Sequence, residues 1–147
     1  MNEIIKKGKK ILFSPQSSVL SAATVIMLMI IAIIFVAVAA YAAVTFPRTV
    51  ASTTVSLTAG INSKTVEFDV PSLHEKAQIE IKVQSGLGAV WSATISSGNN
   101  VLWNKQGSGN YLSDWFNLPT GHYVFTFITL GGSLEAQVNI ITKGGIW

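Results

Sequence analysis

Two hydrophobic patterns divide the chain. From Val19 to Val44 nearly every side chain is apolar, and only Tyr41 and two hydroxyl residues interrupt the run. An α-helix rises about 1.5 Å per residue, so about 20 residues cross the roughly 30 Å of hydrocarbon in a bilayer. Within hydrocarbon every backbone amide must be bonded inside its own segment, which favours a helix over a strand. The run therefore predicts a transmembrane helix over residues 18–46.

The predicted helix is interpreted as a membrane anchor. Lysines cluster just before it in the basic tail at residues 1–17, and the positive-inside tendency places that end in the cytoplasm. The remainder of the chain is then extracytoplasmic. The side chains expected to mark the anchor are Val19, Val25, Ile30, Phe35, Tyr41 and Val44.

A cleaved secretory signal is the alternative interpretation of the same segment. Ala-Tyr-Ala at residues 40–42 resembles a small-residue cleavage site. The apolar core of a signal peptide is about 7 to 15 residues long, and this run is far longer. The length favours a retained anchor.

Beyond the apolar run the pattern changes to alternation. Val66, Phe68 and Val70 alternate with polar residues, which is typical of a half-buried strand. Glycine, asparagine and proline separate successive runs of this kind. The runs predict about eight strands, at residues 53–59, 63–70, 77–84, 89–96, 100–104, 112–117, 121–130 and 133–142.

The predicted fold class is mainly β. Residues 47–54 are rich in threonine and serine and are expected to form a tether. Residues 55–147 are expected to form an antiparallel β-sandwich of the jelly-roll or immunoglobulin-like sort, because short strands at this spacing pack as two sheets.

Composition and charge remove several classes of function. The chain of 147 residues has no cysteine, which excludes a disulfide scaffold, a thiolate metal site and a cysteine nucleophile. The formal charge of +3 resides in the first ten residues, and residues 45–147 carry equal numbers of acidic and basic side chains. A neutral folded part argues against a nucleic-acid partner.

Catalytic chemistry is sparse. There is no nucleophile elbow, phosphate loop or dinucleotide fingerprint, so we expect no enzyme activity and no cofactor. His74 and His122 are both expected to be surface turn residues, without a metal between them. Glu67 and Asp69 share one face of a strand, as a solvated outer face requires.

Three tryptophans, Trp91, Trp103 and Trp115, recur at intervals of one strand and one turn. This spacing favours a role in the core, with each indole at a similar height in the sandwich. The competing interpretation is a surface for a glycan or a protein partner, because aromatic rings and amides gather in this part of the chain. The candidate residues for that surface are Trp103, Asn104, Asn110, Tyr111, Trp115, Phe116 and the C-terminal Trp147.

The order of basic head, apolar helix and all-β domain resembles archaeal type IV pilins and archaellum-type proteins. The resemblance rests on the layout, with Phe-Ser-Pro-Gln-Ser-Ser-Val-Leu at residues 13–20 opening the helix. It implies a helix that packs in a filament core and a sandwich that faces outward. The chain departs from that pattern at Gly8, which is followed by Lys9 and Lys10. The strand at residues 121–125, preceded by Leu118 and Pro119, is similar to small jelly-roll sandwiches of the GOLD kind.

Together these patterns predict a single-pass membrane protein whose extracytoplasmic sandwich acts as a structural, assembly or accessory subunit. The expected partners are the lipid bilayer and other membrane or surface proteins. A carbohydrate-binding surface module and a pilin-like filament subunit are the two alternatives.

Overall fold

The computed structural model describes residues 2–58, 62–145 and 147. Contacts divide the chain into two units, Met1–Ala43 and Val44–Trp147, and Val44 and Thr45 are therefore described with the second unit. The first element, α1 (Asn2–Thr45), is a single helix that continues through the basic segment as well as the apolar run. Its portion Ser21–Thr45 is apolar, with a mean hydropathy of 3.0, and its side chains are exposed except at Ala42, which is half-buried, and Thr45, which is buried.

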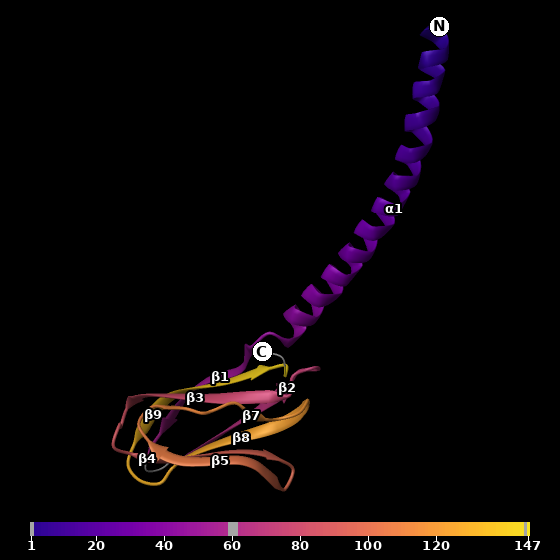
Figure 1. The fold of residues 1–147 in the computed structure, drawn as a ribbon. Helices are drawn as coiled ribbons and strands as arrows, with labels where there is room; N and C mark the ends of the chain where they lie inside the picture. Colours follow the sequence, from indigo (N-terminus) through magenta and orange to yellow (C-terminus); the bar gives the residue numbers. More distant parts are fainter. Residues whose placement is uncertain (1, 59–61, 146) are drawn as a thin grey trace. The chain divides into compact units, whose positions relative to one another are not determined.

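The second unit is a sandwich of two antiparallel sheets, as predicted (Figure 1). One sheet has the order β1 (Arg48–Leu57), β9 (Leu134–Lys143), β3 (Lys76–Ser85) and β6 (Tyr111–Leu112), with β7 (Phe116–Asn117) also paired to β3. The other sheet has the order β2 (Ser63–Val70), β8 (Gly121–Thr129), β4 (Val90–Ser97) and β5 (Asn100–Ser108).

The core lies between the two sheets and follows the alternation of the sequence. On β8 the buried residues are Tyr123, Phe125 and Phe127, and every second side chain of β9 from Leu134 to Ile140 is buried against them. Successive side chains of a strand point to opposite faces, so one apolar row per strand is enough to fill the interior. The predicted inward rows are confirmed.

Strand boundaries differ from the prediction mainly in three places. The strand predicted at residues 100–104 is β5, which continues to Ser108 because its whole length pairs with β4. The strand β1 begins at Arg48, because residues of the Thr/Ser-rich segment pair with β9 from Arg48 and Thr142 onward. The predicted strand at 112–117 is two short strands, β6 and β7. Between them Ser113 is buried, its amide donates to the Ile79 carbonyl at 2.9 Å, and its hydroxyl accepts from the Ile79 amide at 2.8 Å. Ser113 thus supplies hydrogen-bond partners for both backbone groups of Ile79 on β3, in the gap between β6 and β7.

Candidate functional site

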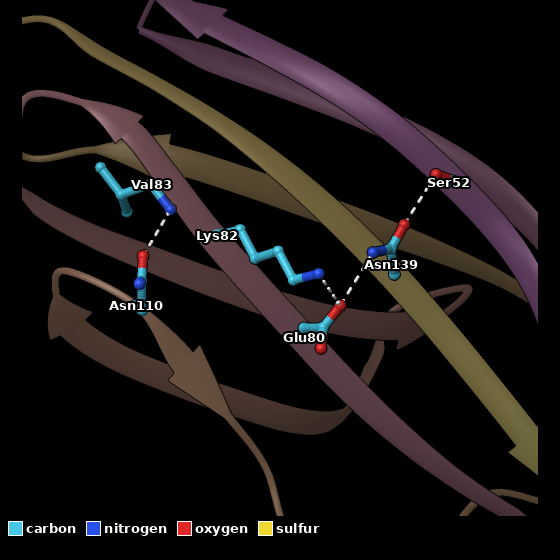
Figure 2. Close-up of polar contacts among 6 residues, drawn as sticks. All are labelled: Ser52, Glu80, Lys82, Val83, Asn110 and Asn139. Atoms are coloured by element: carbon cyan, nitrogen blue, oxygen red, sulfur yellow. Dashed lines mark hydrogen bonds and ion pairs between the residues drawn. The ribbon is translucent and has the colours of Figure 1, made fainter.

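A row of polar side chains crosses the outer face of the first sheet (Figure 2). Ser52 on β1, Asn139 on β9 and Glu80 on β3 are direct cross-strand neighbours. The Ser52 hydroxyl donates to Asn139 Oδ1 at 2.7 Å, and Asn139 Nδ2 donates to Glu80 Oε1 at 2.9 Å. Three adjacent strands therefore share one continuous hydrogen-bonded chain.

Glu80 is the last residue of this row, and its neighbours stabilise its negative charge. The hydrogen bond from Asn139 lowers the pKa of the Glu80 carboxyl below its usual range, and Lys82 lowers it further, while partial burial opposes both. The Lys82 ammonium lies 3.4 Å from the same carboxylate oxygen. The carboxylate is therefore ionised and partly neutralised by a neighbour, which suits a hydrogen-bond acceptor better than a proton donor.

An open groove of about 270 Å³ adjoins this row. It is lined by Glu80, Ile81, Lys82, Asn110, Tyr111 and Leu112. Two residues predicted for a partner surface, Asn110 and Tyr111, are among them. Each already has an internal contact: Asn110 Oδ1 accepts from the Val83 amide at 2.7 Å, and the Tyr111 ring lies 5.6 Å from that of Trp91. The groove offers one carboxylate, one ammonium group and one phenol to a polar partner.

The predicted tryptophans divide between core and surface. Trp91 is fully buried and its indole N–H donates to the Gly109 carbonyl at 3.0 Å, so the core interpretation is correct there. Trp103 is half-buried and stacks on Phe116, with ring centroids 5.4 Å apart and planes inclined by 11°. Since Trp103 is on β5 and Phe116 is on β7, this pair joins the two sheets. Asn104, next to Trp103, is exposed.

The remaining two aromatic candidates, Trp115 and Trp147, both contact the Lys143 side chain. The Lys143 ammonium lies 4.2 Å from the centroid of the Trp115 ring, and it donates to the backbone carbonyl of Trp147. The indole N–H of Trp147 donates to the Thr45 hydroxyl at 2.9 Å, and the ring contacts Phe46 edge-on at 5.5 Å. The C-terminal tryptophan is therefore packed on the residues that follow the apolar run.

The prediction that His74 is a surface turn residue is wrong. The residue is 1% exposed and therefore lies in the interior. Its Nε2 atom lies 2.6 Å from the Val44 carbonyl oxygen and its Nδ1 atom lies 2.7 Å from the Thr142 hydroxyl. A helix ends with carbonyls that lack intrahelical donors, so an imidazole N–H is a suitable partner for one of them. Sequence reasoning missed this role because Val44 is 30 positions away; the unpaired carbonyls at the helix end were the available signal.

His122 is exposed, as expected, and lies between two carboxylates. Its Nδ1 donates to Asp69 Oδ1 at 2.6 Å, whereas its Nε2 lies 4.0 Å from Glu67 Oε1. The hydrogen bond to Asp69 raises the pKa of His122 above its usual value. Within the residues that the structure describes, no group of three His, Cys, Asp or Glu side chains is placed to hold a metal ion.

No family model matches the chain, and no curated protein matches it. Among solved structures, the sandwich is similar to the pre-peptidase C-terminal domain of a collagenase from Bacillus anthracis. The two are 20% identical, with a TM-score of 0.51, over 62% of this chain and 88% of that chain. This similarity shows the β-sandwich fold.

Two further solved structures have lower scores. The C-terminal domain of a structural protein from Sulfolobus turreted icosahedral virus is 13% identical, with a TM-score of 0.42, over 66% of this chain and 98% of that chain. A carbohydrate-binding module of a Cellvibrio mixtus lichenase is 15% identical, with a TM-score of 0.37, over 67% of this chain and 92% of that chain.

Proposed function

We propose that this chain is a single-pass membrane protein whose sandwich acts outside the cytoplasm as a non-catalytic structural, assembly or accessory subunit. One observation carries the proposal: the Ser21–Thr45 segment is apolar and uncharged, its side chains are exposed from Ser21 to Tyr41, and it continues directly into a sandwich that buries its own core. An apolar surface of this size is costly in water and favourable in a bilayer.

The length of the helix supports a retained anchor. The segment has 25 residues, which as a helix span about 38 Å at 1.5 Å per residue and exceed the hydrocarbon thickness of a bilayer. The basic residues before it favour a cytoplasmic N-terminus. Residues 1–17 would then be the cytoplasmic tail, and residues beyond 46 would lie outside.

The surface of the helix supports a role as a subunit. A shallow concavity on one side is lined by Ala32, Ile33, Val36, Ala37 and Ala40. Small side chains let a neighbouring transmembrane helix approach closely, and van der Waals packing then drives association. We infer that partner subunits pack on this side of the helix, in a filament of pilin-like design or in a membrane complex.

The decisive experiment uses the full chain in native membranes. Carbonate washing should leave the wild-type protein in the membrane fraction, and protease added to sealed cells should degrade the sandwich. Ile33→Lys places a charge at the middle of the helix, at a cost of about 3 kcal/mol for insertion, and should release part of the protein. Leu102→Lys, an exposed leucine of β5, is the matched control and should be retained. A wild-type chain that washes off would refute the anchor.

Mass spectrometry of the native protein separates the remaining membrane interpretations. An intact N-terminus supports the retained anchor. Removal of the segment up to residue 42 would indicate a secretory signal, and removal of only the basic head would indicate pilin-like processing. Native complexes should contain more than one subunit, and a monomer without partners in mild detergent would contradict the subunit role.

Glycan binding stays a second prediction. The half-buried Trp103 beside the exposed Asn104 favours it, and so does the polar groove that Asn110 and Tyr111 line, since aromatic faces beside hydrogen-bonding groups suit sugar rings. A glycan array probed with the full chain in detergent tests it. Signal that is lost in Asn104→Ala would support the prediction, and silence across the array would remove it.

A further inference from the structure

Three large apolar side chains are exposed at the end of the sandwich where the apolar run enters it. They are Phe46 (58% exposed), Leu73 (57%) and Trp147 (45%), here called the interfacial patch. Single exposed leucines and valines, such as Leu112 and Val101, occur elsewhere on the sandwich. Three exposed side chains gathered at one end are a different feature, because a cluster of exposed apolar residues marks an interaction surface.

Contacts join Phe46 to Trp147 and bring the backbone of Leu73 to the same end of the sandwich. The rings of Phe46 and Trp147 meet at 5.5 Å, and the Trp147 indole N–H is bound to the Thr45 hydroxyl. A side chain at Gly144 would collide with the Thr45 side chain and approach the Leu73 carbonyl oxygen at 3.1 Å, which places the Leu73 backbone near Thr45. The Gly144 amide donates to the Thr45 carbonyl at 2.8 Å.

Leu73 is held in an unfavourable backbone conformation. Its φ of 66° lies in the left-handed region, which bulky side chains rarely adopt. The turn is fixed by the His74 amide, which donates to the Pro71 carbonyl at 3.1 Å, and by the Thr120 hydroxyl, which donates to the same oxygen at 2.8 Å. A strained residue with an exposed apolar side chain points to a contact made outside the chain.

We propose that the interfacial patch is immersed in the headgroup layer of the bilayer and attaches the sandwich to lipid beside the transmembrane helix. The proposal rests on the anchor proposed above. Because Val44 ends the apolar run and Phe46 follows two residues later, the patch is tied by covalent bonds to the point where the chain leaves the hydrocarbon. No particular orientation of the helix is needed for this argument.

The chemistry of the patch fits this location. Tryptophan and other aromatic side chains favour the layer between hydrocarbon and water, where a ring is apolar and an N–H meets polar groups. Lys143, bound to the Trp147 carbonyl, places a positive charge next to the patch, and a cation near the surface is favourable beside anionic lipids. A second copy of the chain would be the competing occupant.

The test exploits the absence of cysteine in the chain, which allows one fluorophore per molecule. Leu73→Cys and Leu112→Cys are matched variants, because the two leucines are 57% and 58% exposed. The full chain, labelled with an environment-sensitive dye, is reconstituted into phosphatidylcholine and phosphatidylglycerol vesicles. At position 73 the emission should shift to shorter wavelength and be quenched by lipids that carry a headgroup nitroxide, whereas at position 112 it should do neither.

Two controls separate the outcomes. Flotation of the vesicles reports the anchor independently: protein that floats while position 73 behaves like position 112 overturns the patch and leaves the anchor in place. Protein that fails to float overturns both. A shift at position 73 that nitroxide lipid does not quench, and that disappears as the ratio of lipid to protein is raised, would assign the patch to a second copy and overturn the proposal.

Discussion

The Nε2 atom of His74 lies 2.6 Å from the backbone carbonyl oxygen of Val44. A carbonyl oxygen only accepts, so Nε2 carries the proton, and in the neutral ring Nδ1 accepts from the Thr142 hydroxyl at 2.7 Å. The histidine thus connects the Thr142 side chain of β9 to the backbone of Val44 through two hydrogen bonds, and its own ring is buried. Both ring nitrogens are therefore engaged in hydrogen bonds within the chain.

Replacing His74 by alanine should destabilise the sandwich by about 2 to 4 kcal/mol. The substitution opens a cavity and removes the partners of the Val44 carbonyl and of the buried Thr142 hydroxyl, and a buried unpaired group costs about 1 to 3 kcal/mol. Denaturant unfolding of the full chain in detergent, followed by tryptophan fluorescence, measures the loss. The exposed His122→Ala is the control and should unfold close to the wild type, and equal effects of the two substitutions would contradict the role of His74.

Gly144→Ala should destabilise the same junction by about 1 to 3 kcal/mol, because the added methyl group overpacks it. Its Cβ would lie 2.5 Å from Thr45 Cβ, so either the Thr45 side chain or the Gly144–Thr45 hydrogen bond must shift. Gly88→Ala is the matched control, because a Cβ at Gly88 meets nothing within 4 Å. Thermal melting of both variants tests the prediction, which fails if Gly144→Ala melts no lower than Gly88→Ala.

The sequence predicted what depends on local periodicity. The inward rows of β8 and β9 could be predicted because Tyr123, Phe125 and Phe127 alternate with polar residues on their own strand. The start of β1 could not, because residues 49–54 are mostly small hydroxyl side chains on both faces, and only pairing with β9 makes them a strand.

The candidate site depended on register and on distant partners. Ser52, Asn139 and Glu80 come from three strands, and the register that aligns them is a property of the folded sheet. The role of Trp147 was not visible either, since its partner Thr45 is 102 positions away. Trp147 was therefore identified as a candidate without its contact, whereas the row of Ser52, Asn139 and Glu80 was not predicted at all.

Asn139→Ala should reduce the dependence of stability on acidic pH that Glu80 contributes. The pKa of Glu80 is lowered in the folded state, so its contribution to stability is complete above the unfolded pKa and is lost as the pH falls through the folded value. Without the Asn139 donor the folded pKa rises toward 4.5 and this contribution shrinks. Unfolding followed between about pH 3 and 7 measures it, with the non-titrating Glu80→Gln as reference. A wild-type pH profile that matches the Glu80→Gln profile would contradict the lowered pKa.

His122 should show the opposite dependence. Its pKa is raised by the hydrogen bond to Asp69, so its stabilising contribution is present below the unfolded pKa and is lost as the pH rises through the folded value. Asp69→Asn should lower the pKa of His122, measured by NMR titration of the imidazole. Glu67→Gln should lower it less, because Glu67 Oε1 is 4.0 Å from Nε2 while Asp69 Oδ1 is 2.6 Å from Nδ1. Equal shifts in the two variants would contradict the assigned cause.

Trp103 and Phe116 should be energetically coupled. Their rings stack at 5.4 Å between strands of different sheets, and aromatic pairs of this kind contribute about 0.5 to 1.5 kcal/mol beyond the area they bury. A double-mutant cycle of Trp103→Ala, Phe116→Ala and the double variant isolates that energy in denaturant unfolding.

The same cycle also distinguishes packing from ligand recognition at Trp103. If the ring serves mainly to join the sheets, Trp103→Ala lowers the stability of the wild type. The same substitution made in the Phe116→Ala variant then has a much smaller effect, because the partner ring is already absent. If the ring serves mainly as a platform for a glycan, the two substitutions are additive in stability and Trp103→Ala alone abolishes binding on a glycan array. The contact with Phe116 favours the first outcome, and additivity without a coupling energy would refute it.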